Sequence, residues 1–376
     1  MKKCIVVSDS FKGTLSSLEI CEIARTSIPR FFPQCEVVTV PVADGGEGTV
    51  ACFAAALNAQ TVTLTVCGPC GEPVQAAYVR SGEKAIIEMA AAAGLPLAGE
   101  RKDPEKTTTY GVGQLLRHAA EQGAKEILLG LGGSATNDGG CGCAAALGVR
   151  FLDGEGKEFI PTGGTLERIA SIDVAPARTL LRGVRVTAMC DVDNPLTGPR
   201  GAAAVFGPQK GADAEMVARL DRGLRHLDRL IVRELGISVG QTPGAGAAGG
   251  FGAACIAFLG GTLCSGIDAV LDMVEFDRLL DGADLVITGE GRIDSQSVHG
   301  KAISGIAART RKKNVPLVAI AGCIAPDAEE AYTLGVTAMF GIDREALSLG
   351  EYADRSADCY QRTLEDVLRL LKAGIR

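Results

Sequence analysis

The sequence predicts an α/β protein with a doubly wound, flavodoxin-like parallel sheet and an inserted second domain of mixed α/β type. Both ends of the chain alternate short β-branched apolar runs with segments of helical spacing, which is typical of parallel sheets. The middle alternates apolar and polar residues, and 376 residues exceed one ordinary core. We therefore expect a sheet domain from residues 1–59 plus 268–376, an inserted domain at 60–267, and a ligand site in the cleft between them.

The first domain begins with a strand, a helix and a second strand. Residues 3–9 form a short apolar run that predicts a strand buried on both faces. Residues 16–32 have helical spacing, and Ser16 with Glu19 predicts a capping box at the start of the helix. A second apolar run at 35–43 completes a β-α-β unit, which implies parallel strands.

The C-terminal part repeats this pattern and completes a five-stranded sheet. The expected strands are 283–291, 315–323 and 337–343, and the expected helices lie near 300–313, 326–334 and 351–373. Ligands of such sheets bind beyond the carboxyl ends of the strands. The loops after the strands are therefore the places to search for chemistry.

The middle of the chain predicts a different domain. Residues 60–69 and 74–90 indicate antiparallel strands joined at Gly82 and Glu83, and 125–133 and 184–192 indicate further strands. Residues 235–267 lack charge, so their length would permit a membrane span. We favour a glycine loop followed by a short buried helix, because this stretch has many glycines and few large aliphatic residues.

Composition excludes several function classes. A net charge of −7 argues against nucleic acid binding. No signal peptide opens the chain, so we expect a cytoplasmic protein without a membrane anchor, acting as a monomer or homodimer. The thirteen cysteines predict reduced thiols, because the Cys67/Cys70 and Cys141/Cys143 pairs lack the partners that zinc needs.

Two acidic loops follow the first two strands. Asp9, Ser10 and Lys12 combine an acid, a hydroxyl and a cation, which suits phosphoryl chemistry. Asp44 and Glu47 lie among glycines in "PVADGGEGT", where a carboxylate could meet magnesium, phosphate or substrate. The alternatives are a strand-to-helix turn with a solvated lysine and a plain turn.

A glycine-rich loop, "GLGGSATNDGG", spans residues 130–140 after the strand "KEILL". Successive amides in such a loop can form an anion nest. The candidate nucleotide contacts are Gly132, Gly133, Ser134, Asn137 and Asp138. Asp138 is also a candidate base or metal ligand, and the alternative for the whole stretch is a tight turn.

The segment 190–212 supplies oxygen ligands and cations. Asp191 and Asp193 are close in sequence, and Arg200 and Lys210 follow them. The spacing does not fit an EF-hand, and an ordinary turn is the alternative for the acidic part.

Two further loops contain glycines. Gly244, Gly246 and Gly249 match G-x-G-x-x-G, so Gly246 and Gly249 are candidate cofactor contacts and an NAD-dependent oxidoreductase stays open. No clear strand precedes that pattern. The segment 289–302 carries Glu290, Arg292 and Lys301, and its glycine-lysine pair before a helix can hold an anion; surface ion pairs are the alternative.

Taken together, these motifs resemble the signature blocks of the bacterial type I glycerate kinases. The matching stretches are "DSFKG", "PVADGGEGT", "GLGGSATNDGG", "CDVDNPLTGPRGAAAVFGPQKGA" and "GEGRIDSQSVHGKA", in the order of that family. The resemblance implies ATP-dependent phosphorylation of D-glycerate with magnesium. It implies 2-phosphoglycerate as product, with 3-phosphoglycerate as the alternative, in glyoxylate, glucarate or galactarate breakdown.

Physical chemistry then suggests roles for the candidates. We expect Asp191, with Asp9 second, to take the proton of the glycerate hydroxyl. We expect Arg292 or Arg200 to bind the substrate carboxylate, because the planar guanidinium group fits the two oxygens of a carboxylate. Further candidate substrate contacts are Ser10, Asp44 and Glu47. Magnesium would be held by some of the acids Asp191, Asp193, Asp44 and Glu290. The phosphate charges would be met by Lys12, Lys210 and Lys301.

Overall fold

The computed structural model describes residues 1–11, 13–42, 50, 53–54, 59–295, 297, 302–343 and 349–374. The chain divides into two compact units. Unit 1 comprises Met1–Asp44, Ala51–Leu57 and Ser265–Arg376, and unit 2 comprises Gly45–Val50 and Asn58–Cys264. The predicted α/β class is confirmed, because both units combine helices with a sheet. The predicted domain division and the site in a cleft between domains stay predictions.

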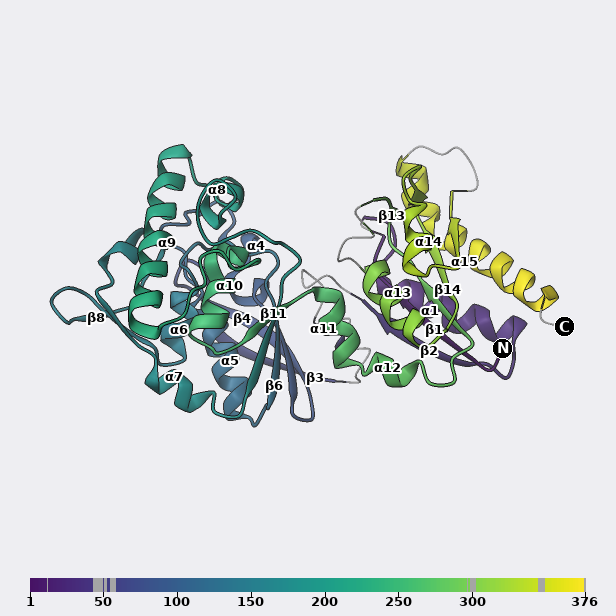
Figure 1. The fold of residues 1–376 in the computed structure, drawn as a ribbon, viewed down its shortest axis with the longest axis horizontal. Coiled ribbons are helices and arrows are strands. Elements are labelled where there is room, and N and C mark those ends of the chain that lie inside the picture. Colours follow the sequence, from purple (N-terminus) through teal and green to yellow (C-terminus); the bar gives the residue numbers. More distant parts are fainter. Residues whose placement is uncertain are drawn as a thin grey trace. The chain divides into compact units, whose positions relative to one another are not determined.

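Unit 1 contains a five-stranded sheet in which all neighbours are parallel (Figure 1). Its strand order is β16-β14-β12-β1-β2. The strands are β1 (Lys3–Ser8), β2 (Glu36–Pro41), β12 (Leu285–Thr288), β14 (Leu317–Ala321) and β16 (Ala338–Gly341). Each corresponds to one of the five apolar runs. A short parallel pair, β13 (Arg292–Ile293) with β15 (Cys323–Ile324), follows β12 and β14 in the chain.

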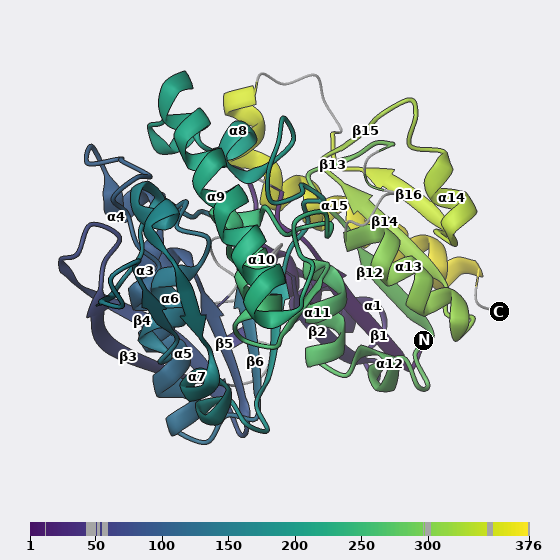
Figure 2. The same cartoon turned by 60° about the vertical axis from the view of Figure 1, so that its left-hand side comes forward.

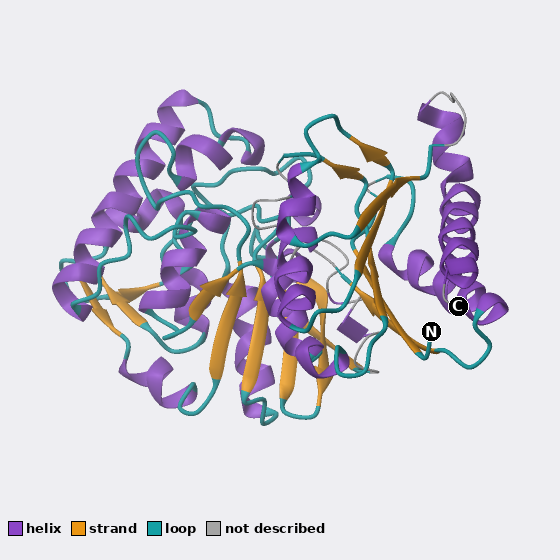
Figure 3. Ribbon diagram, turned by 45° about the vertical axis from the view of Figure 1, so that its right-hand side comes forward, coloured by secondary structure: helices purple, strands orange, loops and turns teal. Residues whose placement is uncertain are grey.

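Helices cover the sheet of unit 1. Ser16 and Glu19 form the predicted capping box at the start of α1 (Ser17–Phe31). Helix α1 packs with α15 (Leu349–Gly374) on the face that carries Cys4 and Val6, and Figure 3 shows the C-terminal helix beside this sheet. Ile5 and Val7 of β1 point to the opposite face of the sheet and are also buried, so that face is covered as well. The other helices that the structure describes in this unit are α11 (Gly266–Met273), α12 (Phe276–Leu279), α13 (Ala302–Lys312) and α14 (Glu330–Leu334).

Unit 2 contains a six-stranded mixed sheet of order β11-β10-β6-β5-β4-β3. The strands are β3 (Gln60–Cys67), β4 (Pro73–Ser81), β5 (Lys84–Glu88), β6 (Glu126–Gly130), β10 (Arg185–Met189) and β11 (Thr262–Cys264). The predicted antiparallel hairpin at Gly82 is confirmed, and β5, β6, β10 and β11 run parallel. The sequence did not reveal β11, because three residues are too few to show a period.

The helices of unit 2 enclose a large core of small and aliphatic side chains. The main elements are α3 (Ala90–Ala93), α4 (Leu95–Ala98), α5 (Tyr110–Glu121), α6 (Cys141–Ala146), α7 (Ala175–Leu180), α8 (Ala202–Phe206), α9 (Ala214–Leu235) and α10 (Ala247–Ala257), with the 3-10 turns η1 (Gly163–Arg168) and η2 (Pro208–Lys210). Figure 2 shows α9 beside α10. A small sheet joins β7 (Arg150–Leu152), β8 (Glu158–Phe159) and β9 (Ser171–Asp173).

The uncharged stretch 235–267 forms a glycine loop and the buried helix α10, as predicted, before β11. Over the part of the chain that the structure describes, no helix has the length and apolar character needed to cross a membrane.

Candidate active site

The parallel strands of unit 2 end together at one edge of the sheet. Glu88 of β5 pairs in register with Gly130 of β6, Gly130 with Met189 of β10, and Met189 with Cys264 of β11. The loops after these strands therefore leave the sheet side by side. The glycine-rich loop follows β6, and Asp191 follows the neighbouring strand β10, so the structure brings two of the predicted motifs together.

The glycine-rich loop presents its first residues to solvent. Gly132 is partly exposed, Gly133 is exposed, and Ser134 is 6% exposed. Two backbone hydrogen bonds fix this part of the loop to the α3–α4 segment: Ala135 N donates to Ala93 O at 2.8 Å, and Leu95 N donates to Gly133 O at 2.9 Å. A ligand would thus meet the Gly132–Ser134 edge of a firmly held loop.

Lys210 lies behind this edge and is only 1% exposed. Its Nζ donates to the Ser134 hydroxyl oxygen at 2.8 Å and to the Thr136 carbonyl oxygen at 2.6 Å. Burial lowers the pKa of Lys210 to about 7, while the nearby Asp138 carboxylate acts in the opposite direction. The predicted direct contact of Lys210 with phosphate charges does not fit this burial.

Asp138 is fully buried and is surrounded by donors. Its Oδ2 accepts from Thr109 N at 2.8 Å, from Thr109 Oγ1 at 2.8 Å and from Gly142 N at 3.2 Å, and its Oδ1 accepts from Gly140 N at 3.0 Å. Burial raises the pKa of Asp138, and these hydrogen bonds oppose the increase. The Asp138 carboxylate thus joins the starts of α5 and α6, and its role as a nucleotide contact, base or metal ligand stays a prediction.

Asn137 is also completely buried. Among the described residues, neither its Oδ1 nor its Nδ2 has a hydrogen-bond partner, and the Thr136 hydroxyl likewise has none. Buried polar atoms of this kind are uncommon and are usually satisfied by water or a ligand. A ligand could reach the Asn137 amide only if the loop opened.

The 244–250 glycines serve loop packing. Gly249 has a φ of +69°, and a Cβ atom there would overlap the Thr136 carbonyl oxygen. Gly249 O also accepts from Gly139 N at 3.0 Å. Gly246 is buried against the Pro195 carbonyl, so the loops after β6 and β10 both close on this segment.

These contacts account for Gly246 and Gly249 by packing, and their contact with a cofactor stays a prediction. The described chain has no strand directly before the G-x-G-x-x-G pattern, which a dinucleotide-binding fingerprint requires. The structure therefore gives no support to the oxidoreductase alternative.

The loop after β10 keeps its acidic residues at the surface. Asp191 and Asp193 are both exposed. Asp193 accepts from Arg200 Nη2 with both carboxylate oxygens, each at 2.9 Å. Because such exposed pairs contribute little free energy, Arg200 could exchange Asp193 for a ligand carboxylate at small cost.

In unit 1, the carboxyl ends of the neighbouring strands β1 and β12 lie side by side. Asp9 N donates to Gly289 O at 2.9 Å, so Asp9 lies beside the start of the Glu290 loop at the carboxyl edge of the parallel sheet. Ser10 N donates to Asp9 Oδ1 at 2.7 Å, and Glu290 is 7% exposed. Two acids and a hydroxyl therefore share this edge.

Arg292 is exposed at the start of β13, with its Nε 3.4 Å from Asp294 Oδ2. Four other candidates lie outside the described residues: Lys12, Asp44, Glu47 and Lys301.

Sequence reasoning missed two residues at the edge of unit 2. Thr109 contacts Asp138 through its amide and hydroxyl, and its Oγ1 also accepts from Cys143 N at 2.8 Å. Glu88 ends β5 and accepts from Val50 N at 2.6 Å. The acid at the end of the apolar run "KAIIE" was a usable signal for Glu88, whereas Thr109 stands in a threonine run without a distinctive pattern.

The described residues were compared for side chains that could bind a metal ion together. Within the described ranges, no three His, Cys, Asp or Glu side chains gather into a metal site. Burial raises the pKa of Cys67, Cys70, Cys141 and Cys143, which disfavours the thiolate form that zinc binds.

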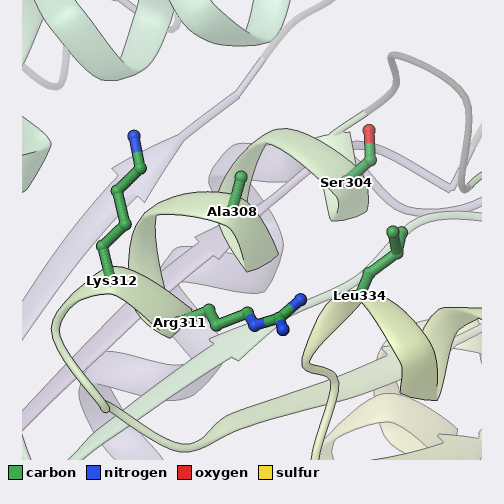
Figure 4. Close-up of a pocket in the computed structure, with 5 residues that line it drawn as sticks. All are labelled: Ser304, Ala308, Arg311, Lys312 and Leu334. Carbon is green, nitrogen blue, oxygen red and sulfur yellow. The ribbon is translucent and has the colours of Figure 1, made fainter.

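A cavity of about 500 Å³ lies on unit 1, between α13 and α14 (Figure 4). Arg311 extends toward Leu334, but Lys312 points away from both. None of the candidate residues lines this cavity, so we place the active site at the strand ends instead. The lining residues are Ser304, Ala308, Arg311, Lys312 and Leu334.

Comparison with known proteins agrees with the motifs. Residues 4–372 match the model of the glycerate kinase family. A glycerate kinase from Bacillus cereus is 45% identical over 98% of both chains, and a glycerate 2-kinase from Escherichia coli K12 is 41% identical over 100% of this chain and 99% of its own. A solved structure of a glycerate kinase 2 candidate from Salmonella typhimurium LT2 shares 42% identity, with a TM-score of 0.89 and 99% of each chain covered. The predicted enzyme class is confirmed: the chain belongs to the glycerate kinase family.

Proposed function

We propose that this chain transfers the terminal phosphoryl group of ATP to D-glycerate and forms 2-phosphoglycerate. The observation that carries the proposal is the shared strand edge in unit 2, where the Gly132–Ser134 loop lies beside the loop that carries Asp191. An anion-binding loop next to an exposed carboxylate suits phosphoryl transfer, which depends mainly on placement and charge. The names of the relatives support the choice of glycerate.

In this proposal the nucleotide phosphates lie on the exposed edge of the glycine-rich loop. Gly132 and Gly133 offer backbone amides, and Ser134 offers a hydroxyl. Lys301, before α13, remains a proposed anion contact, as does Lys12 after β1. Asn137 would join the site only in an opened loop, and Gly246 and Gly249 act through packing.

Asp191 is our proposed general base. It is exposed at the end of β10, where it can accept the proton of the glycerate hydroxyl as the new oxygen–phosphorus bond forms. Asp9 is the second choice, with Ser10 beside it. Arg292 or Arg200 would hold the substrate carboxylate, and Asp44 and Glu47 remain proposed contacts.

Magnesium fits the chemistry of the acidic residues. Asp191, Asp193 and Glu290 carry the carboxylate oxygens that this ion prefers, and it commonly needs only one or two of them besides phosphate oxygens and water. Bound there, it would neutralise charge on the terminal phosphate oxygens.

We also propose that the protein works in the cytoplasm, as a monomer or homodimer, in glyoxylate, glucarate or galactarate breakdown. The described cysteines are free thiols, which is usual for proteins of a reducing compartment.

A coupled assay of ADP release tests the function. We expect release that requires both ATP and D-glycerate, and phosphorus NMR of the product should show 2-phosphoglycerate. ADP release that ignores glycerate would overturn the substrate, and 3-phosphoglycerate would overturn only the position of transfer. Asp191→Asn should lower kcat by about 100- to 10,000-fold, as expected for the loss of a general base.

A further inference from the structure

Lys210 and Ser134 form a stack that runs from the interior of unit 2 to its surface. Lys210 is 1% exposed, Ser134 is 6% exposed, and the adjacent Gly133 is exposed. A ligand at the loop edge would therefore meet Ser134, with the ammonium group behind it.

The hydrogen bonds of Ser134 are informative because a hydroxyl has one proton and two lone pairs. Ser134 Oγ accepts from Lys210 Nζ at 2.8 Å. When Lys210 is protonated, its ammonium group can only donate, so this contact uses a lone pair of the hydroxyl and leaves the serine proton available. Among the residues that the structure describes, that proton has no acceptor.

Lys210 also donates a hydrogen bond to a second acceptor on the same loop. Its Nζ donates to the Thr136 carbonyl oxygen at 2.6 Å. With the lysine present, both groups are held as acceptors of the ammonium, and the serine proton is directed away from it.

We propose that Ser134 donates its hydroxyl proton to a phosphate oxygen of the nucleotide, and that Lys210 is a positioning residue that orients and polarises this hydroxyl from behind. The inference rests on the proposed function, since it assigns the nucleotide to this loop. It differs from the usual role of a kinase lysine, because Lys210 does not touch the phosphate. In its protonated form, Lys210 then acts on the ligand through one hydrogen bond, by way of the Ser134 hydroxyl.

Calorimetric titration of the full-length protein with ATP tests this arrangement. Ser134→Ala and Lys210→Met should each weaken ATP binding by about ten- to a hundredfold, the size expected for a hydrogen bond that involves charged groups. The double variant should be no weaker than the weaker single variant, because the two residues act as one unit. Ser134→Thr keeps the hydroxyl and should restore most of the affinity.

Kinetics separate positioning from a general loss of structure. The KM for ATP should rise in Ser134→Ala and Lys210→Met, while the KM for glycerate stays near the wild-type value. Lys157→Met, at an exposed lysine in the same unit, is the control and should bind ATP like the wild type. If Lys210→Met fails to fold, Ser134→Ala and Ser134→Thr still give the decisive comparison.

Several outcomes would overturn the inference. Losses that add in the double variant would show that the residues act independently, and wild-type affinity in Ser134→Ala would remove the hydroxyl from the site. In either case ATP binding by the wild type would leave the proposed function standing. A wild-type protein that binds no ATP would overturn both proposals together.

Discussion

Asp138→Asn tests whether this carboxylate is structural. Its two oxygens accept four hydrogen bonds in a fully buried position, three of them from backbone amides. An asparagine has a single oxygen. If that oxygen keeps the contacts to Thr109 and Gly142, the new NH₂ group faces the Gly140 amide.

The expected cost follows from that geometry. Two buried donors would face one another, and each unsatisfied donor costs about 1–3 kcal/mol. Loss of the carboxylate charge also removes the favourable partner of Lys210. The neutral amide is easier to bury than a charged carboxylate, which offsets part of the loss. We expect a net destabilisation of about 3 kcal/mol, or a decrease of roughly 6–12 °C in the Tm of a unit of this size.

Differential scanning calorimetry measures this change directly. The matched control is Asp193→Asn, whose carboxylate is 75% exposed and should alter stability by less than about 0.5 kcal/mol. An unchanged Tm in Asp138→Asn, together with a large loss of kcat, would refute the structural role. It would return Asp138 to the list of catalytic or metal-binding residues.

Three further changes have defined outcomes. Gly249→Ala should lower the free energy of unfolding by about 3 kcal/mol or more, since it adds a left-handed backbone penalty to overlap with a carbonyl; an unchanged urea midpoint would contradict the loop packing. Asp44→Asn and Glu47→Gln should reduce turnover far more than Tm, and near-normal turnover in both would identify a plain turn. Between pH 7 and its ordinary pKa of 10.5, Lys210 binds more protons in the unfolded state than in the folded state, so wild-type stability should rise with pH relative to Lys210→Met by up to about 1.4 kcal/mol per pH unit. Parallel stability curves for those two proteins would show that Lys210 has an unshifted pKa.

The sequence predicted those parts of the fold that follow from local pattern. The run at 3–9 became β1, and Ser16 with Glu19 became a capping box, because both depend on residues close in sequence. The sequence did not predict strand β11, because this strand is defined by its pairing with β10. Its three residues carry no pattern of their own.

The site shows a similar division between local and long-range information. Strand-end loops pointed to Ser134 and Asp191, because parallel topology places such loops at one edge. The roles of Asp138 and Lys210 could not be predicted, because they depend on burial by distant segments. Lys210 reaches a loop more than 70 residues away in the chain, and Asp138 binds an amide 29 residues away.

Glycines were ambiguous for the same reason. Gly133 and Gly249 both stand in glycine-rich loops that suit anion binding. Gly133 is exposed, whereas Gly249 is buried against the Thr136 carbonyl. Only the tertiary structure distinguishes an exposed glycine from one that packs against another loop.

The most direct test of the account is a crystal structure of the protein with a non-hydrolysable ATP analogue. We expect phosphate oxygens within hydrogen-bond distance of the Ser134 hydroxyl and the amides of Gly132 and Gly133. Phosphates bound elsewhere, with the Gly132–Ser134 edge left in contact with solvent, would contradict the account.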